Sequence, residues 1–573
     1  MTTNVAFLSV RKKSKDWAMT GQRTNGQYSS TLLPVRCPIS FFSFHIFLAM
    51  TTLRSVVPHI ATKLALGRRT LHSITSLYLI AASPTLADSL RWFFPAPLRP
   101  FSTNTTTGPS EALNLLKKFI SRLEGPTPHR KPPSRADEAV RRSTLQGLAT
   151  SLALEYTKLP LLSKQNQERA AVLSLMAREC GSSETAVASA VSHYQQHAKD
   201  AHRGHLLASL RQACTPRYDR LFHLLLEDNA KEGIRFLISL RQDLLVLIES
   251  FRDDELFVYL KEMDNHMKNL LSAWFGPGML DIRRITYEGT SASIIEAIAT
   301  KEAVHPMRSL EDLRTRLGHD HRVFCAFHAL LPDEPLVFCH VALRPKVSCT
   351  MSDVLKTSHE TNVRVAVFYS ISSTQVGLSG VDLGQFLLKQ AISLLQNEFL
   401  TLEIFVTLSP IPRFRKWLQE KVTLNQGGTF VDDTFLTQED CKLLMRCFHC
   451  TEANVLQTFL TELEDPSRMM GRYAVDLEPL LMKWAARYLV HEKHHGKPLD
   501  GVARFHVRNG ADMYQLNYQA DTSRKGWHNS LGIMINYRYD LPTVEKNQLQ
   551  YELDFNIPVC QGVSKWLPAD MKE

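Results

Sequence analysis

Length, composition and charge already restrict what this chain can do. Its 573 residues exceed the size of a single hydrophobic core, so two to four structural units are expected. The formal net charge is +10, yet residues 1–110 carry twelve Lys or Arg and only two acids, whereas residues 111–573 carry 55 of each. A main body that is neutral on average lacks the broad basic footprint of nucleic-acid binding, so we expect no nucleic-acid partner.

Residues 1–110 have the composition of an organelle transit peptide, rich in Arg, Ser and Thr and poor in acids. From Met50 onward, basic residues are spaced among aliphatic ones so that a basic amphipathic helix can form, and Met50 is a candidate initiator. The apolar run 38–50 is too short to span a bilayer, so no transmembrane segment is expected. The final Met-Lys-Glu is not a peroxisomal tail. We therefore predict that the protein resides in the mitochondrial matrix. The alternatives are the cytoplasm and a disordered leader without a targeting signal.

Residues 111–275 show helical periodicity almost throughout. Leu237, Leu240, Leu244 and Leu247 step by three and four, which places one apolar stripe on one helix face. Similar stripes recur in 143–158, 166–176, 184–198 and 204–213. Successive amphipathic helices predict a bundle without a catalytic constellation, whose role is packing or oligomerisation.

Gly276-Pro277-Gly278 ends the helical run, and short β-branched segments follow. The expected strands are 322–328, 335–342, 363–371, 402–407, 502–507, 512–518 and 531–538, with helices notably over 383–399 and 479–492. The predicted fold class is α+β: an N-terminal all-α helical bundle followed by a mixed α/β domain. The expected units are a leader at 1–110, a bundle at 111–275 and the second domain at 276–573.

The most informative segment reads as a strand, a glycine-rich turn and a helix, over 363–398. Glycines let backbone N–H groups approach a phosphate, and the following helix N-terminus adds a positive dipole end. Neither a Walker loop nor a GxGxxG fingerprint is present, so an ordinary turn remains the commoner explanation on this pattern alone. The candidate phosphate-binding residues are Ser379, Gly380, Val381, Asp382, Leu383, Gly384 and Gln385.

This segment closely resembles the matching run of the malonyl-CoA decarboxylase family, and its turn looks like the pyrophosphate loop of the acetyltransferase fold that binds coenzyme A. Other matches occur in the family's order. They are Pro216-Arg217-Tyr218, Gly233-Ile-Arg-Phe-Leu, Glu302-Ala-Val-His305-Pro306, Leu408-Ser409-Pro410-Ile411-Pro412, Phe505-His506 with Asn509-Gly510, and Asn536-Tyr537-Arg538-Tyr539. The likeness runs from about residue 111 to 539.

The resemblance implies an acetyltransferase-like catalytic domain that converts malonyl-CoA to acetyl-CoA and CO₂. It implies catalytic roles for Ser409, which positions the substrate, and His506, which donates a proton. Coenzyme A would contact the turn residues 379–385, with Asp382 and Tyr539 lining the same pocket. The thioester is itself the electron sink for the carbanion, so no cofactor and no metal is expected. The family also implies a homo-oligomer, a tetramer built through the helical domain.

Three positions depart from the family pattern. Asp382 stands where a glutamate is common, Gly501 replaces a proline before the Phe505-His506 run, and Arg413 replaces a glycine after Pro412. None of these changes removes a catalytic group, so they bear on efficiency more than on the identity of the reaction.

Several patterns suggest other chemistry. Cys447 and Cys450 form a lone CxxC without the second pair that zinc needs, and the ten cysteines show no disulfide framework. The run from His491 to His495 fits HExxH but lacks a third ligand. No GxSxG elbow indicates a hydrolase. The open alternatives are an acyl-CoA N-acyltransferase on the same fold and a non-catalytic protein that binds coenzyme A as a sensor.

Overall fold

The computed structural model describes residues 110–123, 134–163, 166–197, 203–252, 254–357, 362–425 and 435–568. All of these lie in one compact unit that covers 97–573. The predictions for the leader lie outside the described residues. Within the described part, no helix combines the length and the apolar character that crossing a membrane requires.

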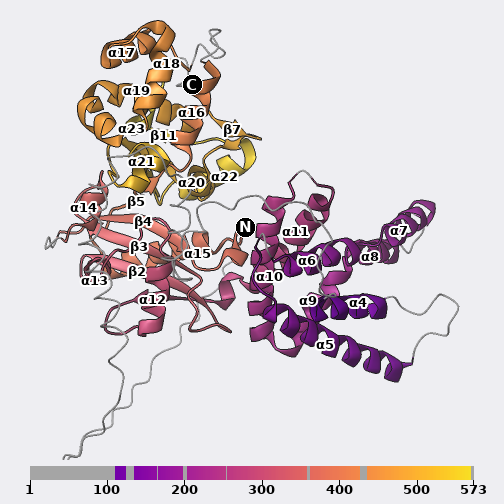
Figure 1. The fold of residues 1–573 in the computed structure, drawn as a ribbon. Coiled ribbons are helices and arrows are strands. Elements are labelled where there is room, and N and C mark those ends of the chain that lie inside the picture. Colours follow the sequence, from indigo (N-terminus) through magenta and orange to yellow (C-terminus); the bar gives the residue numbers. More distant parts are fainter. Residues whose placement is uncertain are drawn as a thin grey trace, which may run out of the picture. The chain divides into compact units, whose positions relative to one another are not determined.

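The first half of the described chain is helical, as predicted (Figure 1). Its helices are α4 (Glu111–Leu123), α5 (Arg135–Lys158), α6 (Glu168–Glu179), α7 (Glu184–His197), α8 (Arg203–Cys214), α9 (Arg217–Asp228), α10 (Ala230–Ser250) and α11 (Leu256–Trp274). The leucine stripe from Leu237 to Leu247 lies on α10 and is fully buried, because its three-and-four spacing keeps all four side chains on one face.

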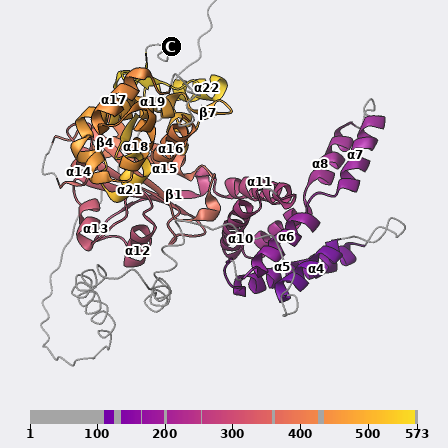
Figure 2. The same ribbon diagram turned by 45° about the horizontal axis from the view of Figure 1, so that its top comes forward.

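Helices α7 and α8 differ from the rest of the bundle. They contact each other, and none of the described side chains of either helix is buried. In Figure 2 the pair projects from the other helices. The apolar stripes expected over 184–198 and 204–213 are therefore helical, but they are not packed into the core of this chain.

The second half is built on a mixed sheet with the order β1-β2-β3-β4-β5-β10-β9-β11, in which β6 pairs with β10. Its strands are β1 (Leu280–Ile285), β2 (His321–His328), β3 (Val337–Arg344), β4 (Val365–Ser373), β5 (Ile404–Thr407), β6 (Ser409–Pro410), β9 (Asp512–Asn517), β10 (Met534–Arg538) and β11 (Val559–Cys560). Neighbouring strands are antiparallel except for the pairs β4–β5 and β9–β11. A separate two-stranded sheet joins β7 (Lys493–His494) to β8 (Lys497–Pro498). The α+β prediction is confirmed.

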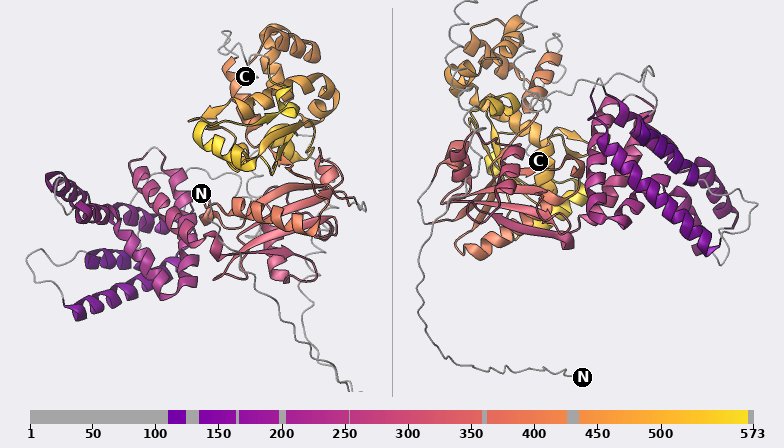
Figure 3. Two further views of the ribbon diagram at one scale, coloured as in Figure 1. Left: turned by 180° about the vertical axis from the view of Figure 1, so that it is seen from behind. Right: turned by 60° about the horizontal axis from the view of Figure 1, so that its bottom comes forward.

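The helices of the second half cover the sheet and extend beyond it (Figure 3). They are α12 (Ala292–Lys301), α13 (Leu310–Arg316), α14 (Met351–Leu355), α15 (Leu383–Glu398), α16 (Phe414–Leu424), α17 (Gln438–Phe448), α18 (Val455–Glu462), α19 (Ala474–Val490), α20 (Gly501–Arg508), α21 (Arg524–Ser530), α22 (Val544–Asp554) and α23 (Gln561–Ser564), with the short turns η1 (Pro277–Met279), η2 (Val376–Leu378), η4 (Glu452–Asn454) and η5 (Arg468–Arg472). The expected helix 383–399 is α15, which packs on β2, β3 and β4.

The strand predicted over 502–507 is wrong, because these residues form α20. The Asp500 carboxylate accepts hydrogen bonds from the backbone N–H groups of Val502 and Ala503 at 2.9 and 2.8 Å, which caps the helix. Ala503, His506 and Val507 are its buried residues, and this three-and-four spacing is helical. The division at 275/276 stays a prediction about folding units, since the described residues form one compact unit.

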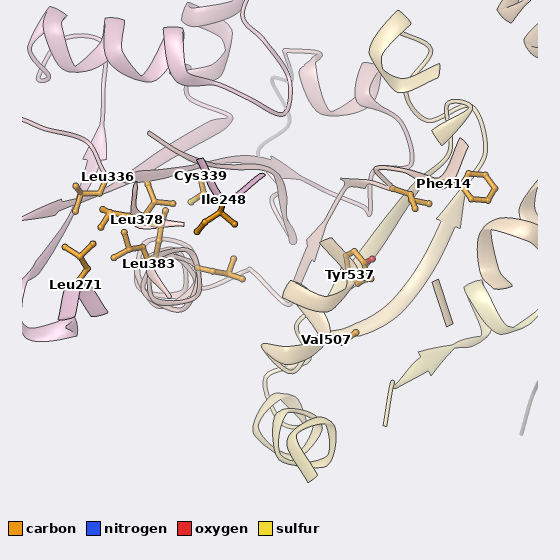
Figure 4. Packing of buried hydrophobic residues seen from close by; sticks show 14 of the residues in the cluster. Ile248, Leu271, Leu336, Cys339, Leu378, Leu383, Phe414, Val507 and Tyr537 are labelled. Atoms are coloured by element: carbon orange, nitrogen blue, oxygen red, sulfur yellow. The ribbon is translucent and has the colours of Figure 1, made fainter. Parts of the chain in front are cut away.

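The glycine-rich turn joins the helical half to the sheet. Gly377 lies so close to α10 that a Cβ there would meet the Ile238 carbonyl oxygen at 1.9 Å. Its own carbonyl accepts a 2.6 Å hydrogen bond from Arg241, whose Nε also bonds Asp264 at 3.0 Å. Figure 4 shows side chains of both halves in one apolar cluster, including Ile248, Leu271, Leu378 and Leu383. The first glycine of the turn therefore serves close packing.

Candidate active site

A cavity opens where two parallel strands of the sheet separate. Strands β4 and β5 pair from Val365 with Ile404 to Phe368 with Thr407, after which the chain turns to β6 and pairs with β10 instead. The gap has a volume of about 210 Å³. Its lining consists of Val304, Phe368, Tyr369, Ser370, Ile371, Thr407, Ser409, Pro410, Gly501, Val502, Phe505 and His506.

The cavity brings together Ser409 and His506, which are 97 residues apart in the sequence. Ser409 Oγ lies 3.3 Å from His506 Nε2 and donates a 2.9 Å hydrogen bond to the Thr407 hydroxyl. On the other side of the ring, His506 Nδ1 lies 2.8 Å from the Tyr539 hydroxyl. The Tyr537 ring stacks on the imidazole at 4.5 Å between centroids. The histidine is thus held by contacts on two edges and one face.

Burial determines the charge state of this histidine. His506 is 4% exposed, and burial lowers its pKa to about 3, so the imidazole is neutral near pH 7. Burial likewise raises the pKa of the Tyr539 hydroxyl far above its ordinary value, so this hydroxyl keeps its proton. We assign Tyr539 as donor to Nδ1, which leaves the proton of the neutral ring on Nε2, directed at Ser409. His506 and Tyr539 together can therefore hold a proton on Nε2 at the cavity while both side chains remain neutral.

The turn residues 379–385 lie outside the cavity lining, along the approach to α15. Gly380 has φ +78, and the Lys268 side chain of α11 lies over it. The backbone N–H groups of Gly384 and Gln385 have no backbone acceptor in the described chain, as is usual in a first helical turn. Asp382 is exposed and forms an ion pair with Arg508 of α20. Asp382 therefore does not join Ser409, His506 and Tyr539, although the resemblance implied a shared pocket.

The two other departures from the family pattern also have a place in the structure. Arg413 adopts the left-handed conformation at φ 71, where glycine has no steric cost. Gly501 is the first residue of α20, where a Cβ would meet nothing within 4 Å. Both positions border the elements that carry Ser409 and His506.

Replacing Gly501 by proline is expected to stabilise the protein by about 1 kcal/mol. Proline suits the first position of a helix, and both the loss of glycine and the gain of proline restrict the unfolded chain. Urea unfolding of the Gly501→Pro variant against the parent protein measures this difference. An unchanged or lower midpoint would show that the ring clashes in the cavity wall.

The other motifs lie apart from the cavity. Cys447 and Cys450 are free, partly exposed thiols. The HExxH run is not on one helix, because α19 ends at Val490 and the second motif histidine, His495, lies in the left-handed conformation at the turn between β7 and β8, so His491 and His495 do not share a helix face. Across the described residues, no group of three His, Cys, Asp or Glu side chains is arranged to hold a metal ion.

Sequence reasoning missed three parts of the site. Thr407 and Asp500 gave no signal, because a threonine at a strand end and an aspartate in a loop are common structural residues. Glu302 was noted only as part of a motif. Its buried carboxylate accepts hydrogen bonds from Ser370 at 2.8 Å and from the backbone of Val304 and His305. Although burial opposes ionisation, the contacts with His340, His305 and Ser370 lower the pKa of Glu302 to about 2.

The fold and the site define an α+β enzyme whose buried serine and histidine face one cavity at the split of a mixed sheet. Two family models match the chain: the malonyl-CoA decarboxylase N-terminal domain over residues 180–275, and the malonyl-CoA decarboxylase C-terminal domain over residues 278–573. The chain belongs to the malonyl-CoA decarboxylase family, as the sequence motifs indicated.

Named relatives and solved structures agree with this assignment. The mitochondrial malonyl-CoA decarboxylase of Rattus norvegicus is 36% identical over 62% of this chain and 72% of its own. The mitochondrial malonyl-CoA decarboxylase of Anser anser anser is 34% identical over 67% of this chain and 76% of its own length. The crystal structure of malonyl-CoA decarboxylase from Rhodopseudomonas palustris, 28% identical, superposes with a TM-score of 0.62 and covers 79% of this chain and 98% of its own. The crystal structure of malonyl-CoA decarboxylase from Agrobacterium vitis, also 28% identical, superposes with a TM-score of 0.63 and covers 80% of this chain and 99% of its own.

Proposed function

We propose that this protein converts malonyl-CoA to acetyl-CoA and CO₂, with Ser409 positioning the thioester and His506 protonating the product carbanion. The observation that carries the proposal is the 3.3 Å approach of Ser409 Oγ to His506 Nε2 at the wall of one cavity. Family membership supports the reaction. The assignment of the two roles rests on the geometry and on the chemistry of the step.

The reaction balances without a cofactor. The bond between Cα and the carboxylate carbon breaks, CO₂ leaves, and the electron pair moves into the thioester as an enolate. A hydroxyl donor aimed at the enolate oxygen typically contributes about 10²–10³ in rate, and Ser409 supplies it when its hydroxyl turns from Thr407 to the substrate. A proton must then reach Cα, and His506 Nε2 faces the same space. We propose no metal and no bound cofactor in this step.

His506 needs a second proton to work as an acid, because a neutral imidazole is a poor donor. The substrate carboxylate supplies one reason for the ring to take up a proton on binding, since an adjacent negative charge raises a histidine pKa. The added proton sits on Nδ1, where the Tyr539 hydroxyl oxygen at 2.8 Å can accept a hydrogen bond from it, and Nε2 then delivers its own proton to Cα and leaves a neutral ring. The ring takes up this proton only when the substrate is bound, so the burial-lowered pKa of His506 in the free protein is unchanged.

The turn residues 379–385 are proposed to bind the phosphates of coenzyme A through backbone N–H groups at the start of α15. The free N–H groups of Gly384 and Gln385 and the left-handed Gly380 support this role. The pantetheine arm would then run along β4 to reach Ser409 and His506. An N-acyltransferase would need a general base for an amine acceptor, and product analysis separates the two reactions.

Mitochondrial residence and a homo-oligomer are further proposals. The relatives from rat and goose are named mitochondrial, which agrees with the composition of residues 1–110. The absence of buried side chains among those described on α7 and α8 supports a contact between copies through the helical half. Import of a 1–110 fusion and light scattering of the full chain test these two statements separately.

The deciding experiment incubates the full chain with malonyl-CoA and quantifies acetyl-CoA and CO₂ together. Equal amounts of both products are expected. The Ser409→Ala variant should lower kcat about 10²–10³-fold, because it removes one hydroxyl from the cavity and leaves the fold intact. A Ser352→Ala variant, at an exposed position of α14, provides the matched control and should match the parent. If coenzyme A binds but malonyl-CoA stays intact, the decarboxylase proposal fails, and a non-catalytic protein that senses coenzyme A takes its place.

A further inference from the structure

A group of buried donors without partners lies behind the catalytic cavity. It consists of Arg316 at the end of α13, Tyr369 on β4 and His305 in the loop after α12. Arg316 and Tyr369 are each 2% exposed. The Arg316 Nε and Nη1 atoms, the Tyr369 hydroxyl and His305 Nε2 are buried and make no hydrogen bond. These three side chains, called the donor cluster below, pack around the Tyr369 ring. The Arg316 Cζ atom lies over this ring at 5.9 Å from its centroid, and the centroid of the His305 ring is 6.4 Å away.

Arg316 lies over the Tyr369 ring, but a buried guanidinium whose N–H groups lack an acceptor is still costly, because both its charge and these groups have left water. Among the described residues, no carboxylate forms an ion pair with Arg316. The nearby Glu302 carboxylate is already used by Ser370 and by two backbone N–H groups. The donor cluster therefore has the composition of a site that is completed by an acceptor from outside the chain.

The donor cluster adjoins the catalytic cavity through the chain itself. Tyr369 belongs to both, and Val304, the neighbour of His305, lines the cavity. The register between β3 and β4 shifts at His340 and Val341, opposite Tyr369. This bulge interrupts the alternation of side chains along β4 at the wall of the cavity. Tyr369 thus makes the donor cluster contiguous with the wall of the cavity.

The cavity lining contains no Lys and no Arg, although the proposed substrate carries a free carboxylate next to its thioester. A substrate carboxylate would give the donor cluster the acceptor that it lacks, and Arg316 would give the carboxylate the cation that the cavity lining lacks. We propose that Arg316, Tyr369 and His305 form the subsite for the free carboxylate of malonyl-CoA, and so distinguish it from acetyl-CoA. This inference rests on the proposed function and names the residues that select its substrate.

The subsite acts on binding more than on the chemical step. A guanidinium stabilises the carboxylate of the bound substrate, and this interaction weakens as the group becomes neutral CO₂. An interaction that favours the ground state lowers KM without raising kcat. Loss of the donor cluster should therefore raise KM for malonyl-CoA and change kcat little.

The test compares Arg316→Gln and Tyr369→Phe with the parent protein and with Arg314→Gln, an exposed arginine on the same helix. For Arg316→Gln we expect KM for malonyl-CoA to rise about 10-fold or more, with kcat within about threefold. The inhibition constant of acetyl-CoA, which lacks the carboxylate, should stay within about twofold. Tyr369→Phe should show a smaller rise in KM and an unchanged melting temperature, because its hydroxyl has no partner to lose.

The other outcomes overturn the inference. A parallel rise of KM and of the acetyl-CoA inhibition constant, or a lower melting temperature, would assign the donor cluster to structure. Unchanged constants would mean that it holds water only. If the parent protein releases no CO₂, the proposed function fails by itself. Calorimetry with malonyl-CoA and acetyl-CoA then decides on the subsite, which requires a preference for malonyl-CoA that Arg316→Gln removes.

Discussion

Replacing His506 by glutamine is expected to lower kcat for malonyl-CoA about 10²–10⁴-fold, the usual range for a general acid. Glutamine fills a similar volume and can still bond the Tyr539 hydroxyl, but it does not take up and release a proton. The enolate would then wait for a proton from water. Steady-state release of CO₂ and acetyl-CoA measures the loss, and the acetyl-CoA inhibition constant shows whether the cavity is intact.

The control for this variant is His528→Gln, which alters an exposed histidine on α21 and should keep full activity. The decisive result is the ratio of the two kcat values. A His506→Gln protein that retains more than about a tenth of the parent activity contradicts the role of His506 as proton donor. In that case the Tyr539 hydroxyl, which lies on the opposite side of the imidazole from Ser409, becomes the candidate, and Tyr539→Phe should be the more damaging change.

Replacing Gly377 by alanine is expected to destabilise the protein by about 3 kcal/mol, at the upper end for overpacking. The new methyl group would lie 1.9 Å from the Ile238 carbonyl oxygen, and both partners are backbone. Neither can rotate away, because Arg241 holds the Gly377 carbonyl from α10 itself. The turn and α10 must therefore move apart. Urea unfolding measures the loss of stability.

Gly147→Ala is the matched control for this change. Gly147 lies within α5, where an added Cβ would meet nothing within 4 Å, so alanine should stabilise the helix by about 0.5–1 kcal/mol. The opposite signs of the two glycine changes are the result to look for. Equal stability of Gly377→Ala and the parent would mean that this glycine is kept for the substrate instead of for packing, and weakened acetyl-CoA binding would then be its only effect.

Much of this protein could be determined from its sequence alone. The leucine stripe of α10 and the strand, turn and helix from β4 to α15 follow from spacing, because periodicity states which side chains share a face. The motifs around Ser409, His506 and Tyr539 led to the family, and the structure places His506 within hydrogen-bonding distance of both Ser409 and Tyr539. Local patterns suffice wherever a residue's role depends on its neighbours in the chain.

Other features were decided only by the tertiary structure. The run 502–507 alternates like a strand, yet Asp500 caps it as a helix that packs its His506 face against the sheet. Asp382 lies outside the cavity lining and forms its ion pair at the surface with Arg508, 126 residues further along. The low pKa of His506, the gap between β4 and β5 and the Arg316 N–H groups that lack an acceptor all arise from burial and long-range contact. Such properties depend on how elements that are distant in the sequence pack against one another, and the order of residues within any one element does not specify that packing.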